Sequence, residues 1–369
     1  MATQTDFILA TAERVRLAAV SGDRLRIRGG GSKDFYGQAL EGELLDTAAL
    51  TGIVSYEPSE LVVTALAGTP LTQLEALLAA QGQYLPFEPP IFSPQSTVGG
   101  MVAAGLSGPA RASVGAVRDF VLGVKLINGK GESLTFGGQV MKNVAGYDVS
   151  RLMVGAMGTL GLLTEVSLKV LPVAPLEATL KFEMSQAQAL TQLNTWGGRP
   201  LPLNASCWLD ENGIGTLYLR LRGAVAAVES ACSKLGGERL PQAQTASDWK
   251  LCRDQQLPWF KERTSTQDLW RLSVPQTTPV LDLPDSPLVE WHGGQRWVRA
   301  DESQGAKLRV LAQNAGGHAT LFIASCARQQ TATARFDALK PPLNRIHREL
   351  KREFDPAGVF NPHRMHAEW

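Results

Sequence analysis

Apolar and polar positions follow two kinds of period along the first 172 residues. Residues 8–20 and residues 71–81 carry apolar side chains at the spacing of an amphipathic helix. Residues 25–28 and 61–65 are short runs typical of strands, and each is followed within a few positions by glycine. The pattern therefore predicts helices and strands mixed along this part of the chain.

A hairpin and a final strand complete the prediction for this region. Residues 121–136 form two apolar runs around Asn128-Gly129, a dipeptide that is a strong signal for a tight β-turn. Residues 162–171 alternate once more as a strand, and Pro172 and Pro175 follow. We place a domain boundary at this proline pair.

The pattern of apolar and polar residues changes beyond residue 175. Strand-like runs such as 216–221 alternate there with helical runs such as 224–235, which predicts a second α+β domain containing a sheet. The region holds seven of the eight tryptophans: Trp196, Trp208, Trp249, Trp259, Trp270, Trp291 and Trp297.

The last part of the chain has a third character, because residues 344–354 read as a charged helix followed by an Asp-Pro turn. The expected organisation is a first domain over 1–172, a second domain over 176–330 and a C-terminal segment over 335–369.

Composition limits the classes of function. Lys and Arg total 36 against 35 Asp and Glu, so no global positive field would attract nucleic acid or anionic lipid. The four cysteines are scattered, which gives no indication of an iron–sulfur cluster or a structural metal site. The N-terminus lacks the features of a signal peptide, and no apolar stretch approaches the ~18–20 residues of a membrane span. We expect a cytoplasmic protein without a metal.

Three segments combine glycines with small hydroxyl residues: RIRGGGSKDFYG (26–37), PQSTVGG (94–100) and GYDVSRLMVGAMGTLG (146–161). Glycine allows a backbone to approach a diphosphate closely and to present N–H groups to it. Side-chain hydroxyls from Ser32, Ser96, Thr97 and Thr159 add further donors. Several such loops together favour a large cofactor that carries a diphosphate.

The familiar phosphate motifs do not account for these loops. A P-loop needs Ser or Thr after its Gly-Lys pair, but Gly131 follows Gly129-Lys130. The glycines of residues 155–161 stand three apart, which is not the spacing of the dinucleotide fingerprint. The cofactor loops must therefore belong to another fold.

The order of these motifs resembles a known group of flavoproteins. RGGGSKDFYG, PQSTVGGMVAAGLSGPARASVGAVRDFVLGV, KNVAGYDVSRLMVGAMGTLGLLTEV and FDPAGVFNP are together similar to the vanillyl-alcohol-oxidase (PCMH-type) superfamily. The similarity covers roughly residues 5–172 and 350–363. It is greatest to the D-lactate and glycolate dehydrogenase branch, and within it to the E subunits of bacterial glycolate oxidases. The resemblance implies an α+β fold with a two-lobed FAD-binding domain, an α+β cap domain and a C-terminal tail that returns to the flavin domain.

The resemblance also implies which residues hold FAD. The first loop would contact the diphosphate, the second would line the diphosphate and flavin from the other side, the third would surround the adenosine half, and the tail would approach the isoalloxazine edge. In that order these residues are Gly29, Gly30, Gly31, Ser32 and Lys33; Ser96, Thr97, Gly99 and Gly100; Gly155, Gly158, Thr159, Gly161 and Leu162; and Asn361.

Two departures from the pattern carry information. Relatives with covalent flavin often have a histidine in the first loop, whereas the first histidine here is His292 and the first cysteine is Cys207. A His- or Cys-linked flavin in the N-terminal domain is thus excluded by composition, so the FAD should be non-covalent. Met157 stands where the branch commonly has an acidic residue, which weakens the third motif by one position without removing a phosphate donor.

The sequence does not identify the catalytic residues. Oxidation of a 2-hydroxy acid needs cations for the carboxylate and a base for the hydroxyl proton. The chain lacks the HxGDGN-like run of zinc-dependent relatives, and Gly317-His318 is the nearest pattern. His363 and His366 stand three apart in the tail. The arginines that suit a carboxylate clamp are Arg296, Arg299 and Arg328. We assign no catalytic acid or base.

Three functions fit these observations. The first is an FAD-binding subunit of a glycolate oxidase complex, working with a related flavoprotein D-type subunit and an iron–sulfur F-type subunit, with membrane contact only through these partners. The second is a self-sufficient FAD-dependent D-2-hydroxy-acid dehydrogenase. The third is a scaffold that has kept the fold without the chemistry. The chain has the full set of FAD loops but few histidines that could serve in catalysis, which favours the first function.

Overall fold

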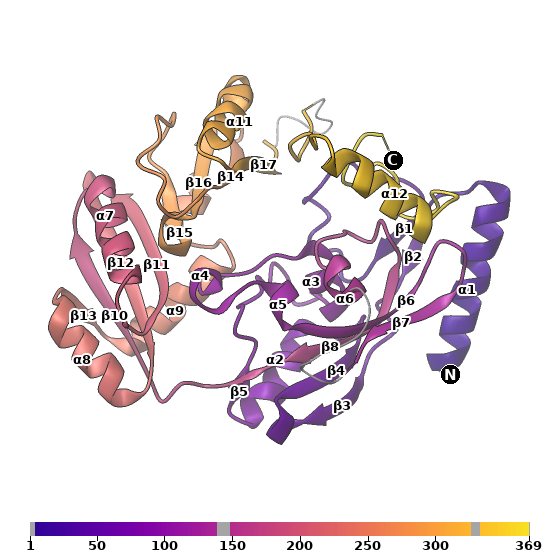
Figure 1. The fold of residues 1–369 in the computed structure, drawn as a ribbon, viewed down its shortest axis with the longest axis horizontal. Helices are drawn as coiled ribbons and strands as arrows, with labels where there is room; N and C mark the ends of the chain where they lie inside the picture. Colours follow the sequence, from indigo (N-terminus) through magenta and orange to yellow (C-terminus); the bar gives the residue numbers. More distant parts are fainter. Residues whose placement is uncertain (1–3, 139–147, 326–332, 369) are drawn as a thin grey trace. The chain divides into compact units, whose positions relative to one another are not determined.

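The computed structural model describes residues 4–138, 148–325 and 333–368. The chain divides into two compact units (Figure 1). The first unit consists of residues 1–106, 116–172 and 338–369, and the second of residues 107–115 and 173–337. The mixture of helices and sheets in each unit confirms the expected α+β class. Within the described residues no helix is both long enough and apolar enough to span a membrane.

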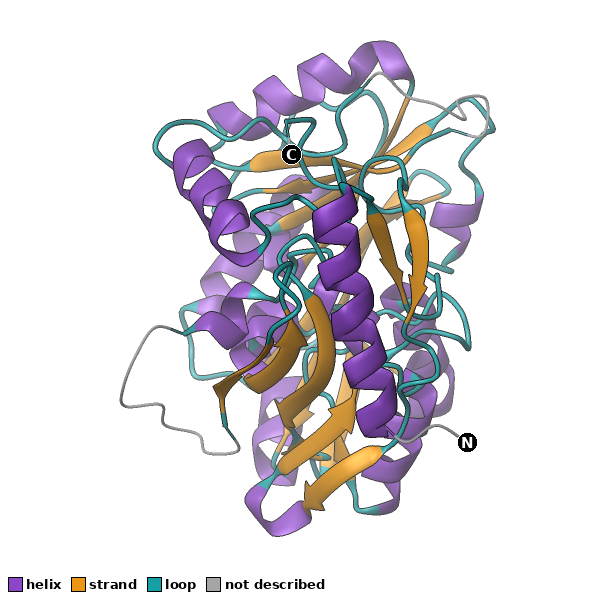
Figure 2. Cartoon of the chain, turned by 90° about the vertical axis from the view of Figure 1, so that its right-hand side faces the viewer, coloured by secondary structure: helices purple, strands orange, loops and turns teal. Residues whose placement is uncertain are grey.

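The first unit begins with a long helix against a small parallel sheet. Helix α1 (Gln4–Ser21) is visible along its whole length in Figure 2, and strands β1 (Leu25–Arg28) and β2 (Glu43–Asp46) follow it. Val15 of α1 is completely buried against Leu25 and Phe360. Burial of this apolar stripe explains why the helix predicted at 8–20 forms, and it brings the C-terminal segment onto β1.

An antiparallel five-stranded sheet is the centre of the first unit, in the order β3-β4-β8-β6-β7. Its strands are β3 (Ile53–Glu57), β4 (Val62–Leu66), β6 (Val121–Ile127), β7 (Ser133–Gly137) and β8 (Leu162–Lys169). The predicted hairpin around Asn128-Gly129 is confirmed, because β6 and β7 pair across this turn. The strands predicted at 61–65 and 162–171 are also confirmed as β4 and β8.

Further short strands and helices complete the first unit. The helix predicted at 71–81 is α2, whose Leu71, Leu74 and Leu78 are fully buried. These elements are η1 (Pro58–Glu60), α2 (Leu71–Ala80), β5 (Gln83–Tyr84), α3 (Val98–Ala104), α5 (Val117–Phe120), α6 (Val149–Leu152), β9 (Leu171–Pro172) and α12 (Leu343–Phe354). The last of them, α12, corresponds to the charged helix predicted at 344–354.

The second unit contains an eight-stranded sheet in the order β13-β10-β12-β11-β15-β16-β14-β17. All of its paired strands are antiparallel. The strands are β10 (Leu176–Glu183), β11 (Leu203–Glu211), β12 (Ile214–Gly223), β13 (Glu238–Leu240), β14 (Asp268–Ser273), β15 (Leu288–Glu290), β16 (Gln295–Ala300) and β17 (His318–Ile323). The helices are α4 (Arg111–Val114), α7 (Gln186–Gly197), α8 (Val225–Leu235), α9 (Gln242–Arg253), α10 (Pro258–Lys261), η2 (Trp291–Gly293), η3 (Glu302–Gln304) and α11 (Gly305–Asn314).

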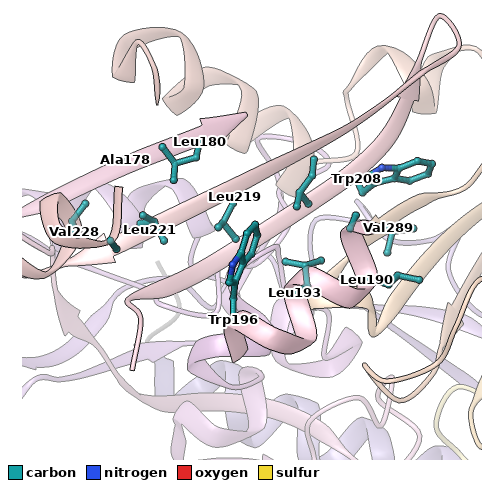
Figure 3. Packing of buried hydrophobic residues seen from close by; sticks show 13 residues of the cluster. Ala178, Leu180, Leu190, Leu193, Trp196, Trp208, Leu219, Leu221, Val228 and Val289 are labelled. Carbon is teal, nitrogen blue, oxygen red and sulfur yellow. The ribbon is translucent and has the colours of Figure 1, made fainter. Parts of the chain in front are cut away.

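The tryptophans of this unit belong to its core. Trp196 of α7 and Trp208 of β11 pack with Leu193, Leu219 and neighbouring aliphatic side chains (Figure 3). Trp270 of β14 is completely buried in a second cluster against α11. On the opposite face of the sheet the Trp297 ring lies 4.9 Å from that of Phe322. Aromatic burial on both faces explains the concentration of tryptophan beyond residue 175.

One part of the predicted domain organisation differs from the structure. Residues 107–115 fall inside the domain predicted over 1–172, yet they belong to the second unit. The reason is local packing: the Trp291 indole Nε1 donates to the Gly108 carbonyl at 3.0 Å, and the Arg111 guanidinium lies 4.4 Å from the centre of the Trp291 ring. A segment of nine residues without a composition boundary gave no sign of this excursion.

Candidate functional site

A cleft in the first unit brings parts of all three glycine loops together. It encloses about 530 Å³ of space free of protein atoms, part of which is open to solvent. Its walls come from β1, α3, the segment 153–163 and the C-terminal segment. The lining residues are Ile27, Gly29, Thr47, Ala67, Gly99, Gly100, Ala103, Met153, Ala156, Met157, Gly158, Gly161, Leu163 and Asn361. Six of these were predicted from the sequence: Gly29, Gly99, Gly100, Gly158, Gly161 and Asn361.

The first glycine loop presents a row of free backbone donors beside this cleft. Within the part of the chain that the structure describes, the N–H groups of Gly29, Gly30, Gly31 and Ser32 donate to no protein acceptor. Gly31 adopts φ +68°, a left-handed conformation that favours glycine. Successive free N–H groups around such a residue form a concave site for an anion, so this loop suits a diphosphate.

The first and second loops touch closely enough to exclude side chains. A Cβ atom on Gly30 would lie 1.5 Å from the Gln95 carbonyl oxygen, and one on Gly29 would lie 2.5 Å from the Thr97 hydroxyl. The Ser96 hydroxyl donates to the Ser32 hydroxyl at 3.0 Å. The two predicted loops are therefore neighbours, and glycine is required where they meet.

The second loop is held by the strand beneath it. Gly99 N–H donates to the Ala67 carbonyl at 2.7 Å, and a Cβ on Gly99 would lie 2.7 Å from that of Ala67. The Thr97 hydroxyl accepts from Gly100 N–H at 3.1 Å and caps α3. Gly99 and Gly100 thus line the cleft, and Gly99 allows the second loop to pack closely on Ala67. The Thr97 hydroxyl is engaged as the N-cap of α3.

The remaining residues of the first loop lie beside the cleft rather than in its wall. The Lys33 ammonium lies 5.6 Å from the centre of the Phe92 ring. Arg28 pairs with Asp34 at 3.0 Å, and a Cβ on Gly31 would meet the Arg28 guanidinium at 2.3 Å. Arg28 and Lys33 supply positive charge next to the free N–H row.

The third loop is shaped by left-handed residues. Gly155, Met157 and Gly158 have φ of +82°, +51° and +72°. Gly155 N–H donates to the Val102 carbonyl at 3.0 Å and Met157 N–H to the Ala103 carbonyl at 2.9 Å. This loop therefore lies along α3, with Met157 in a conformation that is uncommon for a side chain of its size.

Three residues predicted in the third loop, Gly155, Thr159 and Leu162, do not line the cleft, and the side chains of the last two are buried elsewhere. Leu162 is fully buried in the core against α1 and Phe360. The Thr159 hydroxyl donates to the Ala156 carbonyl at 2.7 Å, and its side chain is 1 % exposed. A sequence motif does not show which of its side chains point into the protein core. Thr159 and Leu162 could therefore not be distinguished from the neighbouring residues that line the cleft.

Hydrogen bonds from the C-terminal segment hold the third loop in place. The Lys351 ammonium donates to the carbonyls of Thr159 (2.8 Å) and Phe360 (3.0 Å) and to the Asp355 carboxylate (2.6 Å). Asp355 in turn accepts from the N–H groups of Val359 and Phe360, both at 2.8 Å. Burial, more than any other cause, lowers the pKa of Lys351, while Asp355 acts in the opposite direction.

The same segment also fastens the first loop. The Asn361 amide accepts from Ile27 N–H at 2.7 Å and donates to the Met157 carbonyl at 2.6 Å. The Arg364 guanidinium, 5 % exposed, donates to the carbonyls of Lys33 (3.3 Å), Asp34 (3.0 Å), Tyr36 and Gln38. We name Asn361 and Arg364 the tail staple, because both join the C-terminal segment to the first loop and Asn361 also joins it to the third.

Some site residues escaped prediction. The apolar wall of Ala67, Ala103, Met153 and Leu163 comes from ordinary-looking helix, strand and loop positions. Arg364 follows the predicted Asn361 by three residues, and only its burial distinguishes it from a surface arginine.

Two of the three arginines considered as carboxylate clamps are engaged elsewhere. Arg296 is fully buried and donates to the carbonyls of Gly293, Thr278 and Pro279. Burial lowers the pKa of Arg296 to about 10. Arg299 pairs with Asp285 at 2.7 Å, and Arg328 lies outside the described residues.

The tail histidines have separate environments. His363 Nδ1 lies 3.1 Å from Glu41, whereas the His366 ring lies 6.0 Å from that of His347. Among the described residues there is no group of three or more His, Cys, Asp or Glu that could hold a metal ion.

Comparison with known proteins fits this geometry. Residues 9–137 match the family model described as an FAD binding domain. Over 368 residues, covering 100% of both chains, the sequence is 44% identical to the glycolate oxidase subunit GlcE of Escherichia coli. This chain belongs to the GlcE family. As a member of that family it carries an FAD-binding domain of the PCMH type and is part of an FAD-dependent oxidoreductase.

More distant relatives match parts of this GlcE-family chain. The glycolate oxidase subunit GlcD of Bacillus subtilis is 31% identical over 35% of the chain and 27% of its own length. A D-2-hydroxyglutarate dehydrogenase of Xanthomonas citri is 28% identical over 68% of the chain and 54% of its own length. The solved structure of an alkyldihydroxyacetonephosphate synthase shares the fold, with a TM-score of 0.63 over 96% of this chain and 75% of that one at 15% identity.

Proposed function

We propose that this chain is the FAD-binding subunit of a glycolate oxidase complex, which oxidises glycolate or D-lactate to the 2-oxo acid and passes electrons to an acceptor through partner subunits. The observation that carries the proposal is the row of free N–H groups at Gly29–Ser32 beside the cleft. Identity to GlcE along the entire chain supports the assignment to this complex.

The cofactor would be held without a covalent bond. The chain has no cysteine before Cys207 and no histidine before His292, so the flavin domain up to residue 172 offers neither common attachment residue. Gly29–Lys33 would hold the diphosphate, Ser96–Gly100 would close over it, and residues 155–162 would surround the adenosine half. Thr159 and Leu162 would contribute to that last part by shaping the loop, since their side chains are buried.

Bound FAD would supply a hydride acceptor. The tail staple would keep the loops in place around it, and Ala67, Ala103 and Leu163 would give the cofactor an apolar wall. We give Asn361 a positioning role as well as a place near the isoalloxazine edge. The oxygen and the nitrogen of its side-chain amide already bind backbone groups. We assign no catalytic acid or base in the first unit.

The partners would be a related FAD-binding D-type subunit and an iron–sulfur F-type subunit. Support comes from the similarity along the whole chain to GlcE, which is a glycolate oxidase subunit, and from the partial match to GlcD. We place the complex in the cytoplasm, with any attachment to the membrane made by the partners.

The test begins with an anaerobic visible spectrum of the purified chain, before and after glycolate is added. A flavin band that persists with glycolate and disappears with dithionite supports a subunit that needs its partners. Bleaching by glycolate alone would instead identify a self-sufficient dehydrogenase. Absence of a band even after reconstitution with FAD would overturn the proposal.

Co-expression with the D-type and F-type subunits supplies the second test. The three chains should copurify, and glycolate should then reduce the flavin. Failure of the tagged chain to retain either partner would contradict the assignment to a complex.

A further inference from the structure

Several unusual residues gather at one edge of the eight-stranded sheet. Ser273 ends β14, and its neighbours in the ladder are Gln295, which begins β16, and His318, which begins β17. The turn η2 directly precedes Gln295, so Trp291 and His292 lie at the same edge. Helix α4 packs against η2 and brings Arg111 to it.

The turn η2 has a strained backbone. Trp291, His292 and Gly293 have φ of 55°, 55° and 97°, so two bulky residues in succession are left-handed. Three hydrogen bonds hold the turn: Trp291 Nε1 to the Gly108 carbonyl (3.0 Å), Gln276 Nε2 to the Trp291 carbonyl (3.2 Å), and His292 N–H to the Ser206 hydroxyl (3.0 Å). Strain that the surrounding structure maintains in this way is concentrated at functional sites in proteins.

The strained turn gives Arg111 a fixed platform. The Arg111 guanidinium stacks over the Trp291 ring at 4.4 Å, and Trp291 itself is only 7 % exposed. Stacking restrains the plane of a guanidinium, and its N–H donors then point outward within that plane. The Arg111 side chain is nevertheless exposed.

A second arginine and a histidine lie on the same sheet face. Arg271 is opposite Thr320 and His318 is opposite Ser273, which makes Arg271 and His318 diagonal neighbours on adjacent strands. Such neighbours lie about 7–8 Å apart, within reach of long side chains. The Arg271 guanidinium is packed 5.7 Å from the centre of the Phe322 ring.

Electrostatics join these residues into one positive cluster. Burial is the first cause that lowers the pKa of His318, and the charges of Arg271 and Arg111 lower it further. Asp337 acts in the opposite direction on this pKa. Its carboxylate, however, is bound by Arg309 and by Ala319 N–H. Both arginines therefore act on the imidazole from close by, together with Asp337.

We propose that Arg111, Arg271 and His318 bind the carboxylate of a small 2-hydroxy acid. The planar fork of arginine matches a carboxylate with two parallel hydrogen bonds, and an imidazole N–H adds a third donor. The aromatic rings of Trp291 and Phe322 beside the two guanidinium groups favour a compact ligand. The inference rests on the proposed function for the class of acid, and it places recognition of that acid in the second unit.

The test measures binding of oxalate to the full chain by isothermal titration calorimetry. Oxalate resembles the substrate carboxylate and has no hydrogen to transfer. We expect Arg111→Gln and Arg271→Gln each to weaken binding at least about 10-fold, because each removes a charge-assisted pair. Arg111→Lys should fall between Arg111→Gln and wild type, since it keeps the charge and loses the fork. The matched control is Arg239→Gln, in strand β13 at the opposite edge of the sheet, which should bind as wild type does.

The imidazole supplies a second readout. In an NMR titration of His318, saturating oxalate should raise its pKa, because an anion offsets the two neighbouring cations. This oxalate-dependent rise should be absent from Arg111→Gln and from Arg271→Gln. A role of these arginines in folding alone would not produce a ligand-dependent change in that pKa.

The flavin content of each variant separates this inference from the proposed function. Flavin-containing protein that binds no oxalate up to about 10 mM, or binds it equally in all variants, overturns the inference and leaves the proposed function standing. Arginine-dependent binding of oxalate by a chain that never takes up FAD supports the carboxylate site and overturns the proposed function.

Discussion

The side-chain amide of Asn361 donates to the backbone carbonyl of Met157 at 2.6 Å, and both residues are left-handed, with φ of 42° and 51°. A Cβ on Gly158 would lie 2.6 Å from the same amide nitrogen. The third glycine loop therefore owes its path to a residue about 200 positions further along the chain. Four consequences of the structure can be tested.

Replacement of Asn361 by Asp should weaken FAD binding. The carboxylate can still accept from Ile27 N–H, but it cannot donate to the Met157 carbonyl and repels it instead. Loss of one such buried bond costs about 1–3 kcal/mol, so we expect the Kd for FAD to rise about 10-fold or more. The measurement is a flavin fluorescence titration. Asn212→Asp, in an exposed turn with φ of 56°, is the matched control and should bind FAD normally.

Replacement of Gly30 by Ala should abolish FAD binding. The new methyl group would lie 1.5 Å from the Gln95 carbonyl, so the first and second loops must separate. Gly197→Ala is the matched control, because no atom lies within 4 Å of its added Cβ. The flavin-to-protein absorbance ratio after reconstitution measures the effect. Stoichiometric flavin in Gly30→Ala would show that the first loop is not part of the cofactor site.

Replacement of Lys351 by Met should destabilise the protein. The change leaves the buried Asp355 carboxylate without its cation and removes a donor from the Thr159 and Phe360 carbonyls. Breaking a buried pair in this way costs about 3–5 kcal/mol of unfolding free energy. Urea denaturation is the measurement, and Arg352→Met on the exposed side of α12 should change the value by no more than ~0.5 kcal/mol. Equal losses for both variants would contradict the importance of the Lys351 network.

The stability of the protein should depend on pH through His292. Burial lowers the pKa of His292 from 6.5 to about 4, with Ser206 and Ser113 hydroxyls each 3.0 Å from a ring nitrogen. The unfolded chain binds this proton more tightly than the folded chain, so the contribution is complete above pH 6.5 and is lost as the pH falls towards 4. The loss by pH 4 is about 3 kcal/mol.

His292→Asn isolates this contribution, since Asn tolerates the left-handed backbone at this position. Between pH 7 and pH 4 the wild type should lose about 3 kcal/mol more of its unfolding free energy than the variant. Parallel pH curves for the two proteins would show that His292 does not titrate in this way.

The glycine loops were predictable because a residue without Cβ is required wherever two backbones or a backbone and a diphosphate come close. Gly29, Gly99 and Gly158 could therefore be placed in one site from the sequence. The hairpin at Asn128-Gly129 was predictable for a similar local reason.

The orientation of individual side chains was not predictable. Leu162 and Thr159 belong to the same motif as Gly158, yet their side chains turn into the core. Arg296 has the residue type of a carboxylate clamp, but each of its three guanidinium nitrogens donates to a backbone carbonyl. Such outcomes depend on contacts between segments far apart in the chain, and neither periodicity nor composition records those contacts.

The excursion of residues 107–115 into the second unit has a consequence for recombination between relatives. A chimera that exchanges only residues 173–337 would place a foreign turn against the native Gly108 and Arg111, and would lose the indole contacts made by Trp291. The second unit is thus inherited as two stretches of chain. Grafting it onto another flavin domain requires that both stretches be moved together.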